Sequence, residues 1–158
     1  MNEIVFIPDN VSAEKLSARA EIMRIQESCQ ALDDGHRMDE SPPVKNWLMP
    51  GIYCREIHLP ADSVVVGRIH KFEHLSIISK GRVTVFTESG ETTHKAGDSF
   101  SSPPGTKRVV WAHEDTTWTT IHPNPDNETD IAKLENRYTA MDYAELNMIV
   151  GKSQETLK

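Results

Sequence analysis

The stretch GRIHKFEHLSIISKG, residues 67–81, decides how the rest of this chain is read. It follows three β-branched valines at 64–66, and it places His70 and His74 four residues apart, before an apolar run that Gly81 closes. Two imidazoles on neighbouring strands can bind a divalent metal, and they can also share a proton or hold an anion. The main functional question is therefore which of these the pair does.

Short apolar or alternating runs surround this stretch and predict strands; they lie at residues 53–59, 64–70, 75–79, 83–88, 92–95, 99–101, 106–111 and 116–122. Turn-forming residues such as Lys80-Gly81 and Ala96-Gly97-Asp98 separate most of them. About eight short strands, spaced by roughly ten residues, are typical of an all-β sandwich or barrel. No helical pattern lies between the strands, so a parallel sheet with crossover helices is not expected.

A helix is predicted near the N-terminus. Ser12 is a suitable N-cap, and the glycine of Asp33-Asp34-Gly35 would end the helix. Apolar residues recur between these signals at helical spacing, at Ala18, Ile22, Ile25, Cys29 and Leu32. Residues 2–8 predict a short strand before the helix, and the polar, proline-containing residues 33–46 predict a linker after it.

A second helical region follows Pro123 and Pro125. Ile131, Leu134 and Tyr138 share a helix face, and Asp142 with Glu145 three residues later matches a capping box. The chain therefore divides into an N-terminal helical extension and linker (1–46), a β-barrel (47–123), and a C-terminal helical extension and tail (124–158).

The composition and net charge limit the kinds of molecule that the chain is expected to bind. The 158 residues suffice for one core, and a net charge of -7 argues against a nucleic-acid partner. No apolar run approaches the roughly 20 residues that span a membrane, and the N-terminus has no signal-peptide pattern. Cys29 and Cys54 read as free thiols in a reducing compartment, so a cytoplasmic location is expected. Neither cysteine, nor any serine, lies in an activating motif for nucleophilic catalysis.

The β-region resembles the cupin family, whose members are single jelly-roll-type β-barrels. A cupin motif of glycine, five residues, proline, one residue, glycine, two residues and histidine matches from Gly97 through Pro103 and Gly105, with Arg108 in the histidine position. Counting back from Gly81 along the other cupin motif puts His74 at its glutamate position. The same count puts His70 at the second histidine position and Arg68 at the first.

The resemblance implies that Arg68, His70, His74 and Arg108 point into the barrel, where cupins typically bind a metal through three histidines and one carboxylate. His122 shares a face with Trp118 and Thr120 and is a candidate third ligand beside His70 and His74, and Glu73 is another if its loop turns inward. The metal would be Fe, Mn, Ni or Zn, and the protein would be a dioxygenase-, isomerase- or hydrolase-type enzyme. Two permanently charged guanidinium groups would, however, repel such a cation.

The leading hypothesis uses the same residues to bind an anion. Arg68 and Arg108, helped by His70 and His74, would hold a phosphate- or carboxylate-bearing small molecule. Whether the chain also catalyses a reaction stays open. A structural alternative is that the two arginines only form ion pairs, with Glu56, Glu73 or Asp98. Lys107 and Trp111 would face outward, and a homodimer is expected from the resemblance alone.

Overall fold

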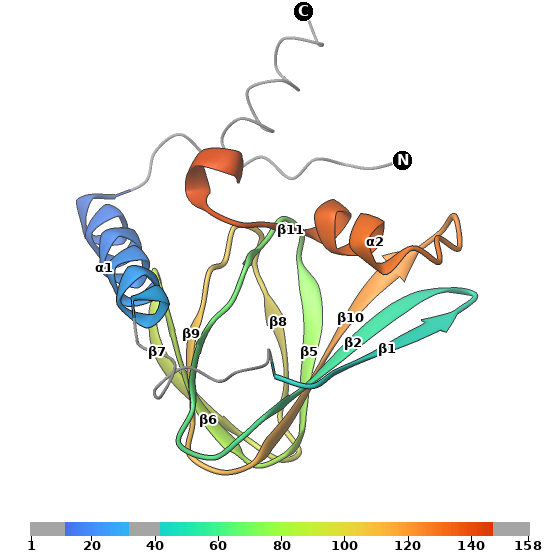
Figure 1. Ribbon diagram of the computed structural model, residues 1–158, viewed down its shortest axis with the longest axis horizontal. Coiled ribbons are helices and arrows are strands. Elements are labelled where there is room, and N and C mark those ends of the chain that lie inside the picture. Colours follow the sequence, from blue (N-terminus) through green and yellow to red (C-terminus); the bar gives the residue numbers. More distant parts are fainter. Residues whose placement is uncertain (1–11, 32–41, 147–158) are drawn as a thin grey trace, which may run out of the picture.

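A computed structural model describes residues 12–31 and 42–146 (Figure 1). The helix end predicted at Gly35, the strand predicted at 2–8 and the tail at 151–158 lie outside the described residues. No helix in the described ranges is both long and apolar enough to cross a membrane.

Strands dominate the described part of the chain. They are β1 (Val44–Met49), β2 (Gly51–Leu59), β3 (Val64–Val66), β4 (Ile69–His70), β5 (His74–Lys80), β6 (Arg82–Thr87), β7 (Gly90–Lys95), β8 (Ser99–Ser102), β9 (Val109–Ala112), β10 (Thr116–Asn124) and β11 (Thr139–Ala140). Two helices flank them, α1 (Ala13–Gln30) and α2 (Ile131–Tyr138). The predicted mainly β architecture with helices at both ends is confirmed.

Two antiparallel sheets form the body. One has the strand order β1-β2-β10-β5-β8 and the other β3-β9-β6-β7, while β4 pairs separately with β11. The sheets converge at one end and separate at the other, where α2 and β11 lie across the opening (Figure 1). This is the jelly-roll-type barrel that the sequence predicts.

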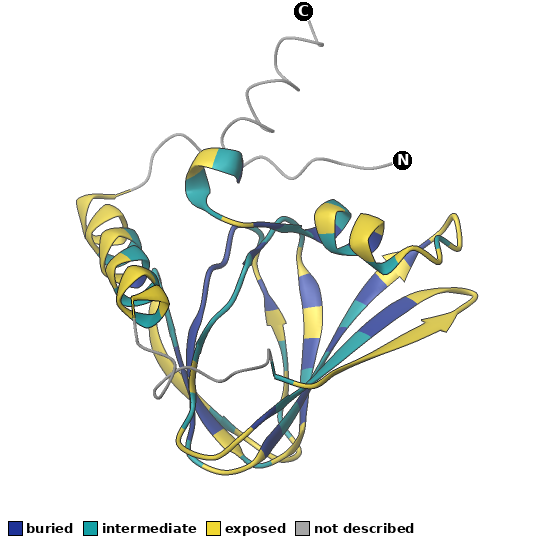
Figure 2. Ribbon diagram, in the orientation of Figure 1, coloured by how far each residue is buried: buried dark blue, intermediate teal, exposed yellow. Residues whose placement is uncertain are grey.

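The core lies between the sheets. Burial alternates along β10, as expected for a strand with one face inward (Figure 2). The main apolar cluster draws on both sheets and consists of Leu59, Ile78, Val83, Val85, Val110, Ala112 and Trp118. A second cluster, of Tyr53, Leu134 and Tyr138, joins α2 to the sheet at the open end.

Three strand boundaries differ from the prediction. The expected linker at 33–46 already contains the start of β1, which pairs with β2 through a tight turn at Gly51, φ 74°. The strand predicted at 64–70 is broken at Gly67, and the one predicted at 106–111 begins only at Val109. At this break the Gly67 N–H donates to the Arg108 carbonyl over 3.0 Å, so the two interruptions lie side by side.

The N-terminal helix is confirmed in the described residues. The Ser12 hydroxyl accepts a hydrogen bond from the Lys15 N–H, which caps the helix as expected. Within α1 only Ile22 is buried. Arg19 fastens the helix to the barrel, because it pairs with Glu88 and its guanidinium lies 4.6 Å from the centre of the Tyr143 ring.

The prediction that Lys107 faces outward is wrong. Its side chain is only 1% exposed, and its ammonium donates to the carbonyls of Gly67 and Met141, each over 3.0 Å. These two acceptors offset the burial of the charge, although burial still lowers the lysine pKa. Lys107 therefore joins the strand break to the segment after α2. Trp111 is exposed, as predicted.

Candidate functional site

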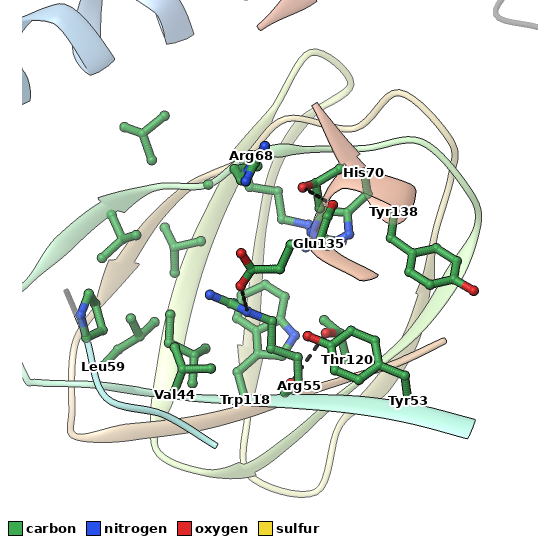
Figure 3. Close-up of a pocket in the computed structure, with 18 residues that line it drawn as sticks. Val44, Tyr53, Arg55, Leu59, Arg68, His70, Trp118, Thr120, Glu135 and Tyr138 are labelled. Atoms are coloured by element: carbon green, nitrogen blue, oxygen red, sulfur yellow. Dashed lines mark hydrogen bonds and ion pairs between the residues drawn. The ribbon is translucent and has the colours of Figure 1, made fainter. Parts of the chain in front are cut away.

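A cavity of about 340 Å³ lies inside the barrel, beneath α2 (Figure 3). Its volume falls within the range of small-molecule pockets, roughly 300–1,000 Å³. Residues of both sheets and of α2 line it, so the pocket exists only where the two sheets separate and the C-terminal helix covers the opening. It is the candidate functional site.

One side of the cavity is cationic. Arg68, His70 and Arg108 all line it, as the sequence predicts. Arg68 occupies the break between β3 and β4, and Arg108 directly precedes β9, so the paired interruptions bring the two arginines to one cavity. The Arg68 Nε is buried and has no hydrogen-bond partner in the described part of the chain. This side of the pocket therefore carries charge that the surrounding residues do not fully satisfy.

His74 lies behind Arg108 and is absent from the lining. The Arg108 guanidinium donates to His74 Nε2 over 2.8 Å, and His74 Nδ1 lies 3.1 Å from the Phe72 carbonyl. An arginine can only donate, so Nε2 must be the acceptor and Nδ1 must carry the proton. His74 is therefore a neutral imidazole that positions Arg108. The guanidinium also lies 5.1 Å from the centre of the Trp118 ring.

Three histidine rings gather beside the pocket. The His70 and His74 centroids are 4.1 Å apart, His74 and His122 are 5.1 Å apart, and His70 and His122 are 5.9 Å apart. Burial is the main cause that lowers the pKa of all three, and the charge of Arg108 adds to it. The pKa falls to about 4 for His74 and about 3 for His122. All three rings are therefore neutral at pH 7.

The histidine cluster does not have the arrangement of a metal centre. No group of three or more His, Cys, Asp or Glu side chains among the described residues is placed to hold an ion. The Nε2 of His74, which would be its ligating atom, accepts the Arg108 hydrogen bond instead. A cation here would also face the buried guanidinium. The residues fit an anion better than a metal.

The ion pairs proposed for a purely structural role of the arginines are not formed. Glu56 pairs with His58, Glu73 accepts from the Ser101 hydroxyl, and Asp98 accepts from the Lys95 N–H. In residues 12–31 and 42–146 no carboxylate forms an ion pair with Arg68 or Arg108.

Four pocket residues were missed from the sequence. Arg55 and Glu135 face each other at 3.7 Å, and Tyr53 and Tyr138 lie at the same end of the cavity (Figure 3). Alternation in β2 already placed Tyr53 and Arg55 on one face, but nothing indicated that this face was internal. The shared helix face of Ile131, Leu134 and Tyr138 indicated that α2 packs against other residues, but nothing in the sequence indicated that it covers the barrel opening and brings Glu135 to the pocket.

Several solved structures are similar to this chain. A cupin-2 domain protein from Shewanella frigidimarina is 16% identical, with 63% of this chain and 92% of that chain covered and a TM-score of 0.43. KdgF from a Halomonas species is 17% identical, with coverages of 64% and 96% and a TM-score of 0.46. Salicylate 1,2-dioxygenase from Pseudaminobacter salicylatoxidans is 16% identical, with coverages of 71% and 33% and a TM-score of 0.49.

No curated protein sequence matches the chain. A family model, described as the AraC-like ligand binding domain, matches residues 49–144, which include β2 to β11, α2 and all of the pocket lining except Pro42 and Val44. The match spans more than half of the chain. The chain therefore belongs to the AraC-like ligand binding domain family.

Proposed function

We propose that this domain binds a small anionic molecule in its barrel pocket, through Arg68, His70 and Arg108, with His74 positioning Arg108. The observation that carries the proposal is the charge of the lining: Arg55, Arg68 and Arg108 against one carboxylate, Glu135. Arginine forks match the geometry of carboxylate and phosphate groups.

The surroundings of Arg108 strengthen this interpretation. Burial lowers its pKa to about 10, which still leaves it charged at neutral pH. A buried charge is unfavourable unless it is paired, and its hydrogen-bond partner in the described residues is the neutral His74 ring. A bound anion would supply the missing countercharge, so binding would stabilise the fold.

A melting assay and calorimetry with inorganic phosphate and simple carboxylates test the proposal. We expect at least one of them to raise the melting temperature, and Arg68→Gln to weaken its binding by about tenfold, the worth of one charge-assisted hydrogen bond. Arg82→Gln is the matched control, because Arg82 lies outside the pocket and pairs with Glu114. Equal effects of the two variants would contradict the assignment of the pocket.

A second candidate is a metal-dependent enzyme of the dioxygenase, isomerase or hydrolase type, acting on a small anionic substrate. The gathering of three neutral imidazoles favours it, because metals bind unprotonated rings. His70, His74 and His122 would be the ligands, which requires His74 to leave Arg108. Elemental analysis after incubation with Fe, Mn, Ni or Zn decides between the candidates. Near-stoichiometric metal, lost in His70→Ala, would support the enzyme, and protein that retains none would support the anion site.

We also propose that two copies associate through β1. This strand is at the open edge of its sheet, and all of its residues are exposed. Several of the exposed side chains on it and on the start of β2 are large and apolar: Val44, Trp47, Leu48, Met49 and Ile52. An exposed apolar edge strand favours pairing with another chain.

A further inference from the structure

We infer that the ligand is an amphipathic monocarboxylate, with one anionic head and an apolar body. The inference rests on the proposed anion site and concerns the rest of the molecule that the site would hold. Its basis is the unequal division of the cavity into a charged side and an apolar side.

Aliphatic side chains form the apolar side of the pocket, and they are Val44, Ile57, Leu59, Val65, Val66 and Val110. Val44 and Leu59 lie at the end of the cavity away from Tyr53 and Tyr138, whereas Arg68 and His70 lie along its charged side (Figure 3). A carboxylate on Arg68 and Arg108 would leave the rest of the ligand against this aliphatic wall.

The aliphatic wall disfavours a polyhydroxylated ligand. None of its side chains can donate or accept a hydrogen bond, so a sugar hydroxyl placed there would lose its bonds to water. Methylene groups in the same position gain free energy from burial. The wall therefore selects an aliphatic or aromatic body over a sugar phosphate.

Glu135 disfavours a second negative charge. It is the one carboxylate in the described lining, and it lies 3.7 Å from Arg55. Arg55 is thereby already paired, and a ligand carboxylate near it would meet the like charge of Glu135. Arg55, the third arginine of the pocket, therefore does not provide a second binding position for an anion. The charge balance suits a monoanion.

Calorimetry with a series of carboxylates tests the inference. Affinity should rise about fourfold for each added methylene from butanoate through hexanoate to octanoate, the value of one buried methylene. Adipate, which has the length of hexanoate and a second carboxylate, should bind at least tenfold more weakly than hexanoate. Glu135→Gln should recover most of that loss, because it removes the like charge and frees Arg55.

A pair of valine variants tests the aliphatic wall. Val65→Thr adds a hydroxyl to the lining at constant shape and should weaken octanoate binding several-fold. Val64→Thr is the matched control on the same strand, because Val64 is 50% exposed and lies outside the lining. Equal octanoate affinity in the two variants would overturn the inference.

Failure of the inference can be told from failure of the anion site. If phosphate or glucose 6-phosphate binds more tightly than octanoate, with loss in Arg68→Gln, the anion site stands and the amphipathic ligand is excluded. Octanamide, which has no charge, tests the head group. Binding of octanamide as tight as that of octanoate would overturn both proposals, and so would the absence of binding by every anion.

Discussion

Arg108 donates a hydrogen bond over 2.8 Å to Nε2 of His74, and both side chains are buried, 6% and 4% exposed. In the resemblance to the cupin motifs, the arginine stands at the histidine position of one motif and the histidine at the glutamate position of the other. If that correspondence holds, the pair would put a fixed cation and its neutral acceptor where two metal ligands are expected.

His74→Phe should therefore lower the free energy of unfolding by about 3 kcal/mol, because it leaves a buried guanidinium without its acceptor. His74→Gln retains a side-chain oxygen that can accept from Arg108, so its loss should be clearly smaller. Urea unfolding at pH 7 measures both. Equal losses would show that ring packing, not the hydrogen bond, is what His74 supplies.

Stability should fall as the pH drops below about 6.5. The unfolded chain binds protons on His74 and His122 near pH 6.5, whereas the folded chain resists protonation until about pH 4 and pH 3. Above pH 6.5 both states carry neutral rings and this contribution vanishes. In the window from 6.5 to 4 the unfolded state gains protons first, so each pH unit below 6.5 costs about 1.4 kcal/mol per histidine.

The change of the unfolding free energy with pH is best measured between pH 6.5 and 5, where carboxylates titrate little. The double variant His74→Gln/His122→Gln should make the slope clearly shallower and leave the share of His70, whose pKa burial also lowers, whereas Val64→Thr should keep the full slope. An unchanged slope in the double variant would show that other groups cause the pH dependence.

Gly81→Ala should be among the most damaging single changes in the barrel. Gly81 has φ 84°, and a Cβ there would overlap the Thr116 side chain and the Asp115 carbonyl. Gly90 also has positive φ, 118°, but a Cβ there meets no atom within 4 Å. We expect Gly90→Ala to cost about 1–2 kcal/mol of backbone strain and Gly81→Ala at least about 3 kcal/mol. Similar losses by thermal unfolding would contradict the close approach at Gly81.

The proposed homodimer should have twice the 17.8 kDa mass of the chain in light scattering. Met49→Lys introduces a charge on the exposed edge strand and should yield monomers, with little change in the stability of the fold itself. Leu16→Lys is the control, because Leu16 is similarly exposed (55% against 47% for Met49) but lies on α1. A monomer before mutation would end the proposal, as would dissociation caused by Leu16→Lys alone.

The barrel was predictable because its strands carry local signals. Period-two alternation and turn glycines are written into short windows, and Gly81, Gly97 and Gly105 all adopt the positive φ expected of such turns. The edge strand β1 was missed because an exposed strand needs no apolar face, and its Lys45 and Asn46 resemble a linker.

The pocket was predictable only in part. Arg68, His70 and Arg108 followed from the cupin motifs, which fix their positions relative to Gly81 and Gly97. The contribution of Arg55 and Glu135 depends on a contact between residues 80 positions apart in the chain, and no local pattern encodes it. The burial of Lys107 was missed for the same reason, since its two carbonyl acceptors come from distant segments.

The two hydrogen bonds donated by the Lys107 ammonium make the segment after α2 part of the structure that encloses the pocket. The ammonium holds Met141 against Gly67, next to Arg68, while Tyr138 and Glu135 from the preceding helix wall the cavity. Removal of Met141 and the residues after it would therefore affect the pocket as well as the C-terminal segment. It would leave the buried Lys107 ammonium with only one of its two acceptors, the Gly67 carbonyl, so the residues that follow the barrel in sequence contribute to the stability of the pocket wall.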